Sequence, residues 1–595
     1  MTSRADRPPL ASPQLVRRRL GGRLLGGRGR TSPFDAITIV IALILIGIVI
    51  VPLARVLIGL FFVDGRFTIA PIVKTFALPD LGALILNTVI VAGCSSVAAV
   101  IIGTAFAWLN ERTNVRMGLF ADALPLLPLL LPPVAGAVGW TMLLSPRAGL
   151  LNAWFRDFVG LFGIDLGGTG PLDINSWYGL IMVYTFYAVP FVYMNVSASF
   201  RNFDASLEEA SRLSGAGAFR TLRRVVVPAV IPGIGAGFLL CVWLGFGMFS
   251  VPSIIGTPAG IDVLSVRIVH LLTFSYPPHT DVAVGLSGIV VVFVGLAYVL
   301  QVRILRKGRY ATMKGKGARS KLTDVGLWKW PLRAVELFYV LISTVLPIFA
   351  LVIVALNGFW TPKIRWGNLS LQALQTSVLD DSITRQSLFN SLGLAIVGGL
   401  VGILIAAMVA IYVSRRHTKF ARALDAGIKL PTAVSIMVLA VGILLFLAAP
   451  PFNLSGTLLI LLIGYVAIFI PQASVAADSA VSSVGAELPE ASAVTGAGSF
   501  RTFRMIQLPL IIPGLIVGWV MLFVRILGDL EVAAILSGTG NPVLGFRILD
   551  VFNGGSFALL ASLSTVIVAI SAIVVILALA YGRRKSRFGS SMNVG

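Results

Sequence analysis

The chain has 595 residues, of which 57% are hydrophobic and only 12% are charged, and its mean hydropathy is +0.93. A soluble domain carries about 25% charged residues, so this composition excludes an ordinary soluble protein and indicates an integral membrane protein. The formal net charge of +22 would suit nucleic acid or anionic lipid as a partner, and the placement of the basic residues decides between them.

Twelve apolar stretches are long enough to cross a bilayer as helices, which takes about 20 residues each. Six lie in each half of the chain, so we expect an all-α integral membrane protein of about 12 transmembrane helices. The first six stretches are 36–62, 83–108, 118–145, 177–199, 229–256 and 282–304. The second six are 334–357, 388–413, 424–449, 456–475, 510–535 and 557–582.

Lysine and arginine gather in alternate gaps between these stretches. The positive-inside rule then places both termini and the central linker in the cytoplasm of a multi-pass inner or plasma membrane protein. The charge is thus explained by topology and by contact with bilayer lipid, without nucleic acid. Each half has an even number of spans, so the two six-helix halves are parallel repeats. The expected parts are a tail at 1–35, a first half at 36–304, a linker at 305–332, a second half at 333–582 and a tail at 583–595.

One polar loop occurs twice, near 206–228 and near 487–509, and we call these the duplicated loops. Of the 25 positions from 209 to 233, 14 hold the same residue as the position 281 further along. Bilayer chemistry imposes little on a polar loop, so the match indicates a true duplication. The residues that we predict to be functional in these loops are Glu209, Ala210, Ser211, Gly215, Phe219 and Arg220, and again Glu490, Ala491, Ser492, Gly496, Phe500 and Arg501.

The composition of the loops favours a short helix, a break and a second short helix that a partner protein can grip. Acidic residues come first and basic residues last, as the helix dipole prefers. Gly215 and Gly496 can adopt positive φ, so each is a natural point for one helix to end. Small residues before the glycine let a partner approach the backbone, and Phe219 or Phe500 offers an apolar anchor.

The order Glu-Ala-Ser, three residues, Gly, and Pro about a dozen residues later resembles the EAA loop of ABC importer permeases. The chain departs from that pattern only in having Ser for the third Ala. The resemblance implies that each duplicated loop docks on one ATP-binding subunit, so that one chain engages two copies. It also implies an extracytoplasmic solute-binding protein that delivers the substrate.

Two flanking segments, 131–152 and 528–533, resemble the fused permeases of ferric-iron uptake systems. This resemblance implies ferric iron as the substrate. Relatives that import polyamines, thiamine, phosphonates or sulfate share the EAA loop, so these substrates remain alternatives.

No Gly-x-x-x-x-Gly-Lys-Ser/Thr loop is present, so the chain is predicted to be a transport subunit with no catalytic residues. We expect ATP and Mg²⁺ to be bound by the partner subunits and no cofactor by this chain. The spacing of His270, His279 and His417 predicts no metal site. His270 and His279 lie near an outward-facing loop, so a role in passing iron along is an alternative to an ordinary interface position. Cys94 and Cys241 fall inside apolar stretches and are interpreted as packing residues.

Ionisable groups in hydrocarbon are costly and usually face a pathway or a partner. Asp529 and Glu531 are therefore candidates for the pathway of a cationic substrate, although Arg525 is one turn away and could pair with Asp529. Asp122 and Asp425 lie near the cytoplasmic ends of their stretches, where they could equally lie at the interface. Residues 150–164 are predicted to form an amphipathic helix in the outer interface.

Two other classes of protein remain possible on these observations. An ion-coupled secondary transporter would need a membrane-embedded ion site and would bring no ATPase with it. A membrane scaffold that transports nothing would have no use for the duplicated loops.

Overall fold

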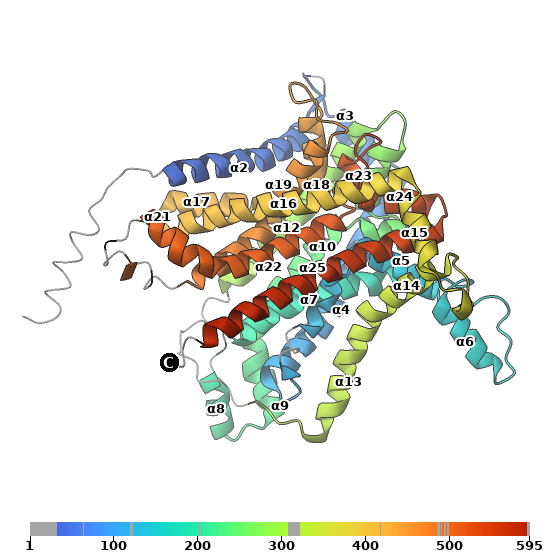
Figure 1. Cartoon of the computed structure of the whole chain (residues 1–595), viewed down its shortest axis with the longest axis horizontal. Helices are drawn as coiled ribbons and strands as arrows, with labels where there is room; N and C mark the ends of the chain where they lie inside the picture. The colour runs from blue at the N-terminus through green and yellow to red at the C-terminus, as the bar shows by residue number, and fades with distance from the viewer. Residues whose placement is uncertain are drawn as a thin grey trace, which may run out of the picture.

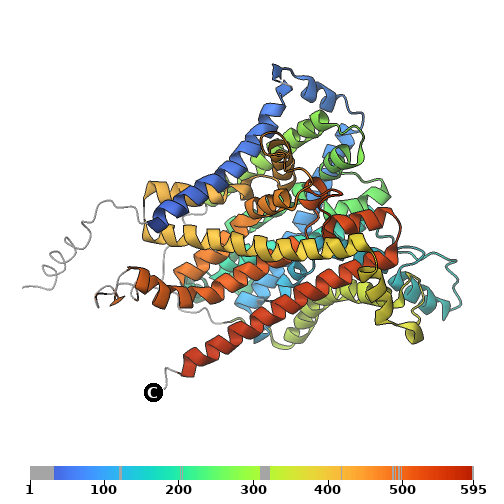
Figure 2. The same ribbon diagram turned by 45° about the horizontal axis from the view of Figure 1, so that its top comes forward.

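The computed structural model describes residues 33–63, 65–118, 123–201, 203, 205–307, 322–416, 418–484, 488, 491, 492, 496 and 499–591. Over these residues the chain is mostly helical, and the long helices of the first half recur in the same order in the second, whereas β1, β2 and α6 have no counterpart among the described elements of the second half. The long helices α16 and α25 run most of the length of the molecule, and the two views of the ribbon agree on this arrangement (Figures 1 and 2).

The first half contains α2 (Pro33–Gly59), β1 (Phe62–Val63), β2 (Arg66–Phe67), α3 (Ala70–Phe76), α4 (Leu81–Arg112), η2 (Leu124–Leu130), α5 (Pro133–Leu144), α6 (Leu150–Gly160), α7 (Trp177–Arg201), α8 (Ala205–Leu213), α9 (Ala218–Thr221), η3 (Leu222–Val226), α10 (Val227–Gly247), η4 (Pro252–Gly256), η5 (Thr257–Ala259), α11 (Leu264–Val269), η6 (His270–Phe274) and α12 (Thr280–Lys307). The two strands form an antiparallel hairpin in which Phe62 is opposite Phe67.

The second half contains η8 (Gly326–Trp328), α13 (Lys329–Val340), η9 (Leu341–Val345), α14 (Leu346–Asn357), η10 (Trp366–Asn368), α15 (Leu371–Leu379), α16 (Ser382–Arg415), α17 (Lys419–Ile428), η11 (Leu430–Ala433), α18 (Ile436–Leu447), α19 (Leu458–Ser482), α21 (Ser499–Thr502), η12 (Phe503–Gln507), α22 (Leu508–Leu527), α23 (Ala533–Leu536), α24 (Leu544–Asn553) and α25 (Phe557–Ser591).

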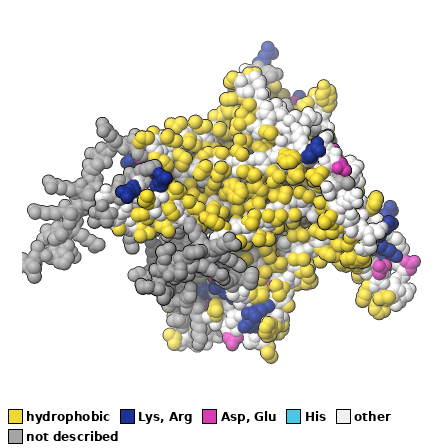
Figure 3. All heavy atoms as spheres, in the orientation of Figure 1, with side chains coloured by type: hydrophobic (Ala, Val, Ile, Leu, Met, Phe, Trp, Pro, Cys, Tyr) yellow, Lys and Arg dark blue, Asp and Glu magenta, His cyan; other side chains and the backbone are white. Residues whose placement is uncertain are grey.

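Ten helices of the described chain are long and apolar enough to cross a membrane, or up to 12 if each sharply bent pair counts as one span. The expected number of about 12 is therefore confirmed. Hydrophobic side chains cover the middle of the face seen in Figure 3, and charged side chains lie toward its edges. That distribution is what a hydrocarbon core flanked by water requires.

Two of the expected spans are wrong as single straight helices. The stretch 118–145 is divided into η2 and α5, which meet at an angle of 97°. The stretch 424–449 is divided among α17, η11 and α18. Proline causes both breaks, because Pro132 and Pro431 lie at the junctions and proline cannot donate the backbone hydrogen bond that continues a helix.

Two further expected spans, 229–256 and 510–535, end early. The helix α10 stops at Gly247 and α22 stops at Leu527. Short helices follow each stop, and in the first half the pair Pro252–Ala259 and Leu264–Phe274 is bent by 96°. These bent segments lie opposite the duplicated loops, at the other end of the bundle, which we call the far end.

The two halves are interlocked by an exchange of their first helices. The helix α2 of the first half packs against α16 and α18 of the second half, whereas α14 packs against α5 of the first. Both crossings depend on a glycine. A Cβ at Gly442 would lie 2.6 Å from the Pro52 carbonyl oxygen, and a Cβ at Gly139 would lie 2.7 Å from that of Pro347. Neither half therefore has a complete helix bundle of its own.

Candidate functional site

The first duplicated loop is built from α8, a turn at Gly215, α9 and the π-helical turn η3, which continues into α10. The helix α7, which contains Pro190, leads into it, and α19, which contains Pro471, leads into the second loop. In Figure 1, α8 and α9 lie at the bottom and α21 at the left of the helices, and the end of α25 lies between them.

The glycine of each loop has the left-handed backbone conformation that its position predicts. Gly215 has φ +78° and Gly496 has φ +82°. Around Gly215, the amide of Ser214 donates to the Ala210 carbonyl and the amide of Ala216 to the Ser211 carbonyl, which closes the end of α8. No atom of the described chain lies within 4 Å of a Cβ built on either glycine, so backbone conformation alone requires glycine here.

A hydroxyl pair ties the two arms of each loop together. The Ser211 and Thr221 hydroxyl oxygens are 3.0 Å apart, and those of Ser492 and Thr502 are 2.8 Å apart. The same pair joins the segments before and after the glycine in both copies. The sequence interpretation treated Ser211 and Ser492 only as small residues, so it missed this role, although Thr221 and Thr502 are identical positions of the repeat.

A buried ion pair fixes the first loop to the transmembrane bundle. Arg112, the last residue of α4, lies 3.2 Å from Glu208 of α8, and the two side chains are 7% and 11% exposed. The Arg112 guanidinium also donates to the Phe200 carbonyl oxygen at 2.9 Å and stacks on Phe203. Glu208, which was not among the predicted residues, is thus the anchor, and the Glu209 side chain lies outside the described residues.

The second loop is attached through the equivalent arginine. Arg415 ends α16 as Arg112 ends α4, and it donates to the Gln507 side-chain oxygen at 2.9 Å. Its guanidinium also lies over the Phe503 ring, 5.7 Å from the centroid. Glu490, predicted for this loop, falls outside the described residues.

The exposed surface of the first duplicated loop combines small, apolar and basic side chains. Ala210 and Arg220 are exposed, and the apolar side chains of Leu207 and Leu213 are 52% and 89% exposed. In the second loop Ala491, Arg501 and Met505 are exposed. The side chains of Phe219 and Phe500, the predicted anchors, lie outside the described residues. Such a face suits a protein partner better than solvent.

The two predicted pathway acids lie close together in the interior, after the end of α22. Asp529 is 1% exposed and Glu531 is 2% exposed. Arg525, which could have paired with Asp529, forms its ion pair with Glu531, at 3.9 Å. Asp529 instead accepts a hydrogen bond from the Val532 amide at 2.9 Å, because the chain turns sharply there to begin α23.

Of the other candidate polar residues, Asp425 forms a local ion pair. Its carboxylate pairs with Lys429 at 2.6 Å, and Lys429 also pairs with Asp478. Asp122 and His417 fall outside the described residues. Cys241 is buried and Cys94 is exposed, and neither forms a disulfide. In the part of the chain that the structure describes, no three His, Cys, Asp or Glu side chains form a group that could hold a metal ion.

The predicted amphipathic helix is α6, which ends at Gly160, four residues earlier than expected. Its aromatic side chains Trp154, Phe155 and Phe158 are exposed, and it projects from the far end of the molecule at the right of Figure 1. An exposed aromatic face of this kind suits the membrane interface.

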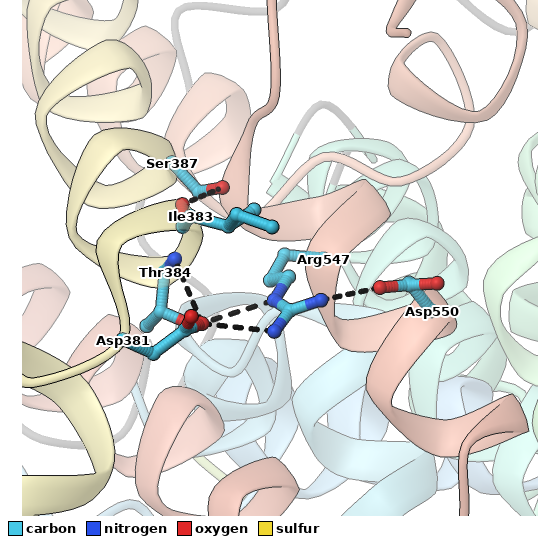
Figure 4. A network of polar contacts seen from close by, with 6 residues as sticks. All are labelled: Asp381, Ile383, Thr384, Ser387, Arg547 and Asp550. Carbon is cyan, nitrogen blue, oxygen red and sulfur yellow. Dashed lines mark hydrogen bonds and ion pairs between the residues drawn. The ribbon is translucent and has the colours of Figure 1, made fainter. Parts of the chain in front are cut away.

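A duplicated brace at the far end was not predicted. Asp381 caps α16 and pairs with Arg547 of α24 at 2.8 Å, and Arg547 also binds Asp550 (Figure 4). Hydrogen bonds from the Thr384 hydroxyl and amide, aided by Arg547, lower the pKa of Asp381. In the first half, Asp80 before α4 pairs with Arg267 of α11 at 3.3 Å.

Further contacts of the brace occur in both halves. The Asn87 side chain donates to the Asp262 carbonyl and the Asn390 side chain to the Pro542 carbonyl. Thr88 and Ser391 accept from the Leu264 and Leu544 amides. The segments 263–269 and 543–549 are similar in sequence, which is the signal that could have revealed the brace.

Comparison with known proteins identifies the class to which this architecture belongs. The family model for the binding-protein-dependent transport system inner membrane component matches residues 95–309 and 398–586, more than half of the chain. The chain therefore belongs to that family. It is the multi-pass membrane permease of an ABC importer, with the two halves fused in one chain, and the alternative of an ion-coupled secondary transporter is excluded.

Individual relatives agree with this class. The ferric transport system permease protein FbpB of Actinobacillus pleuropneumoniae is 22% identical over 547 residues, which cover 90% of this chain and 76% of the relative. The probable ABC transporter permease protein y4fN of Sinorhizobium fredii is 25% identical and covers 86% of this chain and 89% of its own length. The spermidine/putrescine permease PotB of Haemophilus influenzae is 26% identical, but the match covers only 37% of this chain and 75% of PotB.

Proposed function

We propose that this permease imports ferric iron, that each duplicated loop docks on one copy of a separate ATP-binding subunit, and that a solute-binding protein delivers the cargo at the far end. ATP and Mg²⁺ act in the partner subunits. The duplicated loops and both termini then face the cytoplasm, as the basic residues require. Ferric iron is favoured because three relatives described as ferric or Fe(3+) transport permeases each match more than 80% of this chain.

The main support for the coupling role is the internal geometry that the two duplicated loops share. Each has a left-handed glycine, and each has a hydroxyl pair joining the segments on either side of it. Each is also tied to the bundle by the arginine that ends a long helix, α4 or α16. Movement of a docked partner would therefore be transmitted to α4 and α16 as well as to α10 and α22.

The test replaces Gly215 and Gly496 with valine in the complex reconstituted with its ATP-binding and solute-binding subunits. Valine at positive φ is strongly strained, so both loops should lose their shape. ATP hydrolysis should then continue without substrate uptake. Gly217→Val is the matched control, because Gly217 does not have positive φ and a Cβ there also meets open space. Normal coupled uptake in both glycine variants would refute the coupling role.

A further inference from the structure

The second half alone has three charged residues where its transmembrane bundle meets the first half. At the 281-residue spacing of the duplication, Leu244, Met248 and Ser250 of the first half correspond to Arg525, Asp529 and Glu531 of the second. The duplication therefore aligns three uncharged residues with a complete charged triad. Packing does not explain this difference, because Asp529 and Glu531 are as fully buried as their uncharged neighbours.

The triad lies on the axis that relates the two halves. The Ser250 hydroxyl donates to the Glu531 carboxylate at 2.9 Å, and these two residues are equivalent positions of the repeat. Equivalent points of two bodies related by a twofold axis can touch only at that axis. A pathway shared equally by both halves must run along the same line.

Close contacts on either side of the axis repeat the symmetry. A Cβ on Gly528 would lie 2.4 Å from Pro132 of the first half, and a Cβ on the equivalent Gly247 would lie 3.1 Å from the Ser435 hydroxyl of the second half. The start of α5 thus packs against the end of α22, and the start of α18 packs against the end of α10. The structure is closed around the triad, which explains the burial of its carboxylates.

The charges of the triad do not balance. One guanidinium of the described chain, that of Arg525 at 26% exposure, forms an ion pair with these carboxylates, and it approaches Glu531 only to 3.9 Å. No hydrogen-bond donor of the described chain reaches Asp529 Oδ1 or Glu531 Oε2. Two ionised carboxylates and one guanidinium leave a net negative charge, and a buried charge without a partner is strongly unfavourable. A bound cation would supply the missing positive charge.

We propose that Asp529 and Glu531, with the Ser250 hydroxyl, form a transit site for a bare, oxygen-preferring metal cation. This inference rests on the proposed import of ferric iron and specifies where the ion passes. Carboxylate and hydroxyl oxygens are the ligands that hard cations prefer. Three protein ligands hold an ion weakly, and Arg525 opposes its binding, as release into the cytoplasm requires.

The test measures uptake of radioactive Fe³⁺ by the full complex in proteoliposomes, for the wild type and for Glu531→Gln and Asp529→Asn. The glutamine keeps an oxygen for the Ser250 hydroxyl but removes the charge. Iron uptake should fall roughly tenfold or more, in line with the loss of a metal contact, while the loaded binding protein still stimulates ATP hydrolysis. Glu336→Gln is the matched control, because Glu336 of α13 is equally buried at 1% exposure, has no hydrogen-bond partner among the described residues and lies outside the triad.

Equilibrium dialysis of the nanodisc-embedded chain with Ga³⁺ gives a second readout that does not depend on transport. The wild type and Glu336→Gln should bind Ga³⁺, and Glu531→Gln should lose that binding. Iron uptake or Ga³⁺ binding by Glu531→Gln equal to that of the wild type would overturn the transit site while leaving the importer function intact. A wild-type complex that imports no iron would refute the proposed cargo and the transit site together.

Discussion

The buried ion pair between Arg112 and Glu208 should determine how firmly the first duplicated loop is held. In Glu208→Gln the side chain keeps its shape and loses its charge, so the Arg112 guanidinium remains nearly buried without its counter-ion. Removing one partner of a buried pair costs about 3–5 kcal/mol. Arg112 still has the Phe200 carbonyl and the Phe203 ring, so we expect about 2 kcal/mol here.

Hydrogen–deuterium exchange of residues 205–213 in nanodiscs measures this loss directly. A destabilisation of about 2 kcal/mol corresponds to roughly 30-fold faster exchange of the α8 amides. Asp281→Asn is the control, because Asp281, 25% exposed, pairs at 2.6 Å with Lys74, whose side chain is 61% exposed, and neither residue lies on α4 or α8. Such an exposed pair contributes less than about 1 kcal/mol. Equal exchange rates in the two variants would refute the anchoring role of Glu208.

Two further predictions concern the hydroxyl pairs and the far-end brace. Ser211→Ala and Ser492→Ala should each destabilise their loop by about 1 kcal/mol and lower coupled uptake to a similar extent, because both copies contain the same hydroxyl pair. Ser214→Ala is the control, because it removes only a hydrogen bond to the Ala210 carbonyl. Loss of coupled uptake in one of the two serine variants alone would contradict a role shared by both loops. The pKa of Asp381 is lowered in the folded protein, so the stability that this carboxylate contributes is present above its ordinary pKa of 3.8 and is lost as the pH falls through the lowered pKa. The thermal unfolding temperature should therefore depend less on pH between pH 5 and pH 3 in Asp381→Asn than in the wild type. The same pH dependence in both proteins would argue against the brace.

The sequence was sufficient to predict the features that depend on local chemistry. Apolar length identified the membrane spans, and the repeat located both duplicated loops with the positive φ of Gly215 and Gly496. Proline within an apolar stretch was the local signal that was overlooked, since Pro132 and Pro431 divide two stretches that hydropathy alone joins.

Contacts between distant segments could not be read from composition. Nothing at Glu208 indicates that Arg112, 96 residues earlier, lies beside it, and charge spacing suggested Asp529 as the partner of Arg525 when the folded chain brings Glu531 there. The exchange of α2 and α14 between the halves depends on glycine contacts that only the assembled bundle reveals. The boundaries predicted for the two halves, the linker and the tails stay a prediction.

The central claim is that both duplicated loops dock on ATP-binding subunits, and cross-linking tests it most directly. Cysteine would replace the exposed Ala210 or Ala491 in a chain whose Cys94 and Cys241 are changed to alanine, and the complex would be treated with a short thiol cross-linker. We predict that each position links to the ATP-binding subunit and that the double variant links two copies to one chain. A link from only one loop, or labelling of either cysteine from the extracytoplasmic side of intact cells, would contradict the claim.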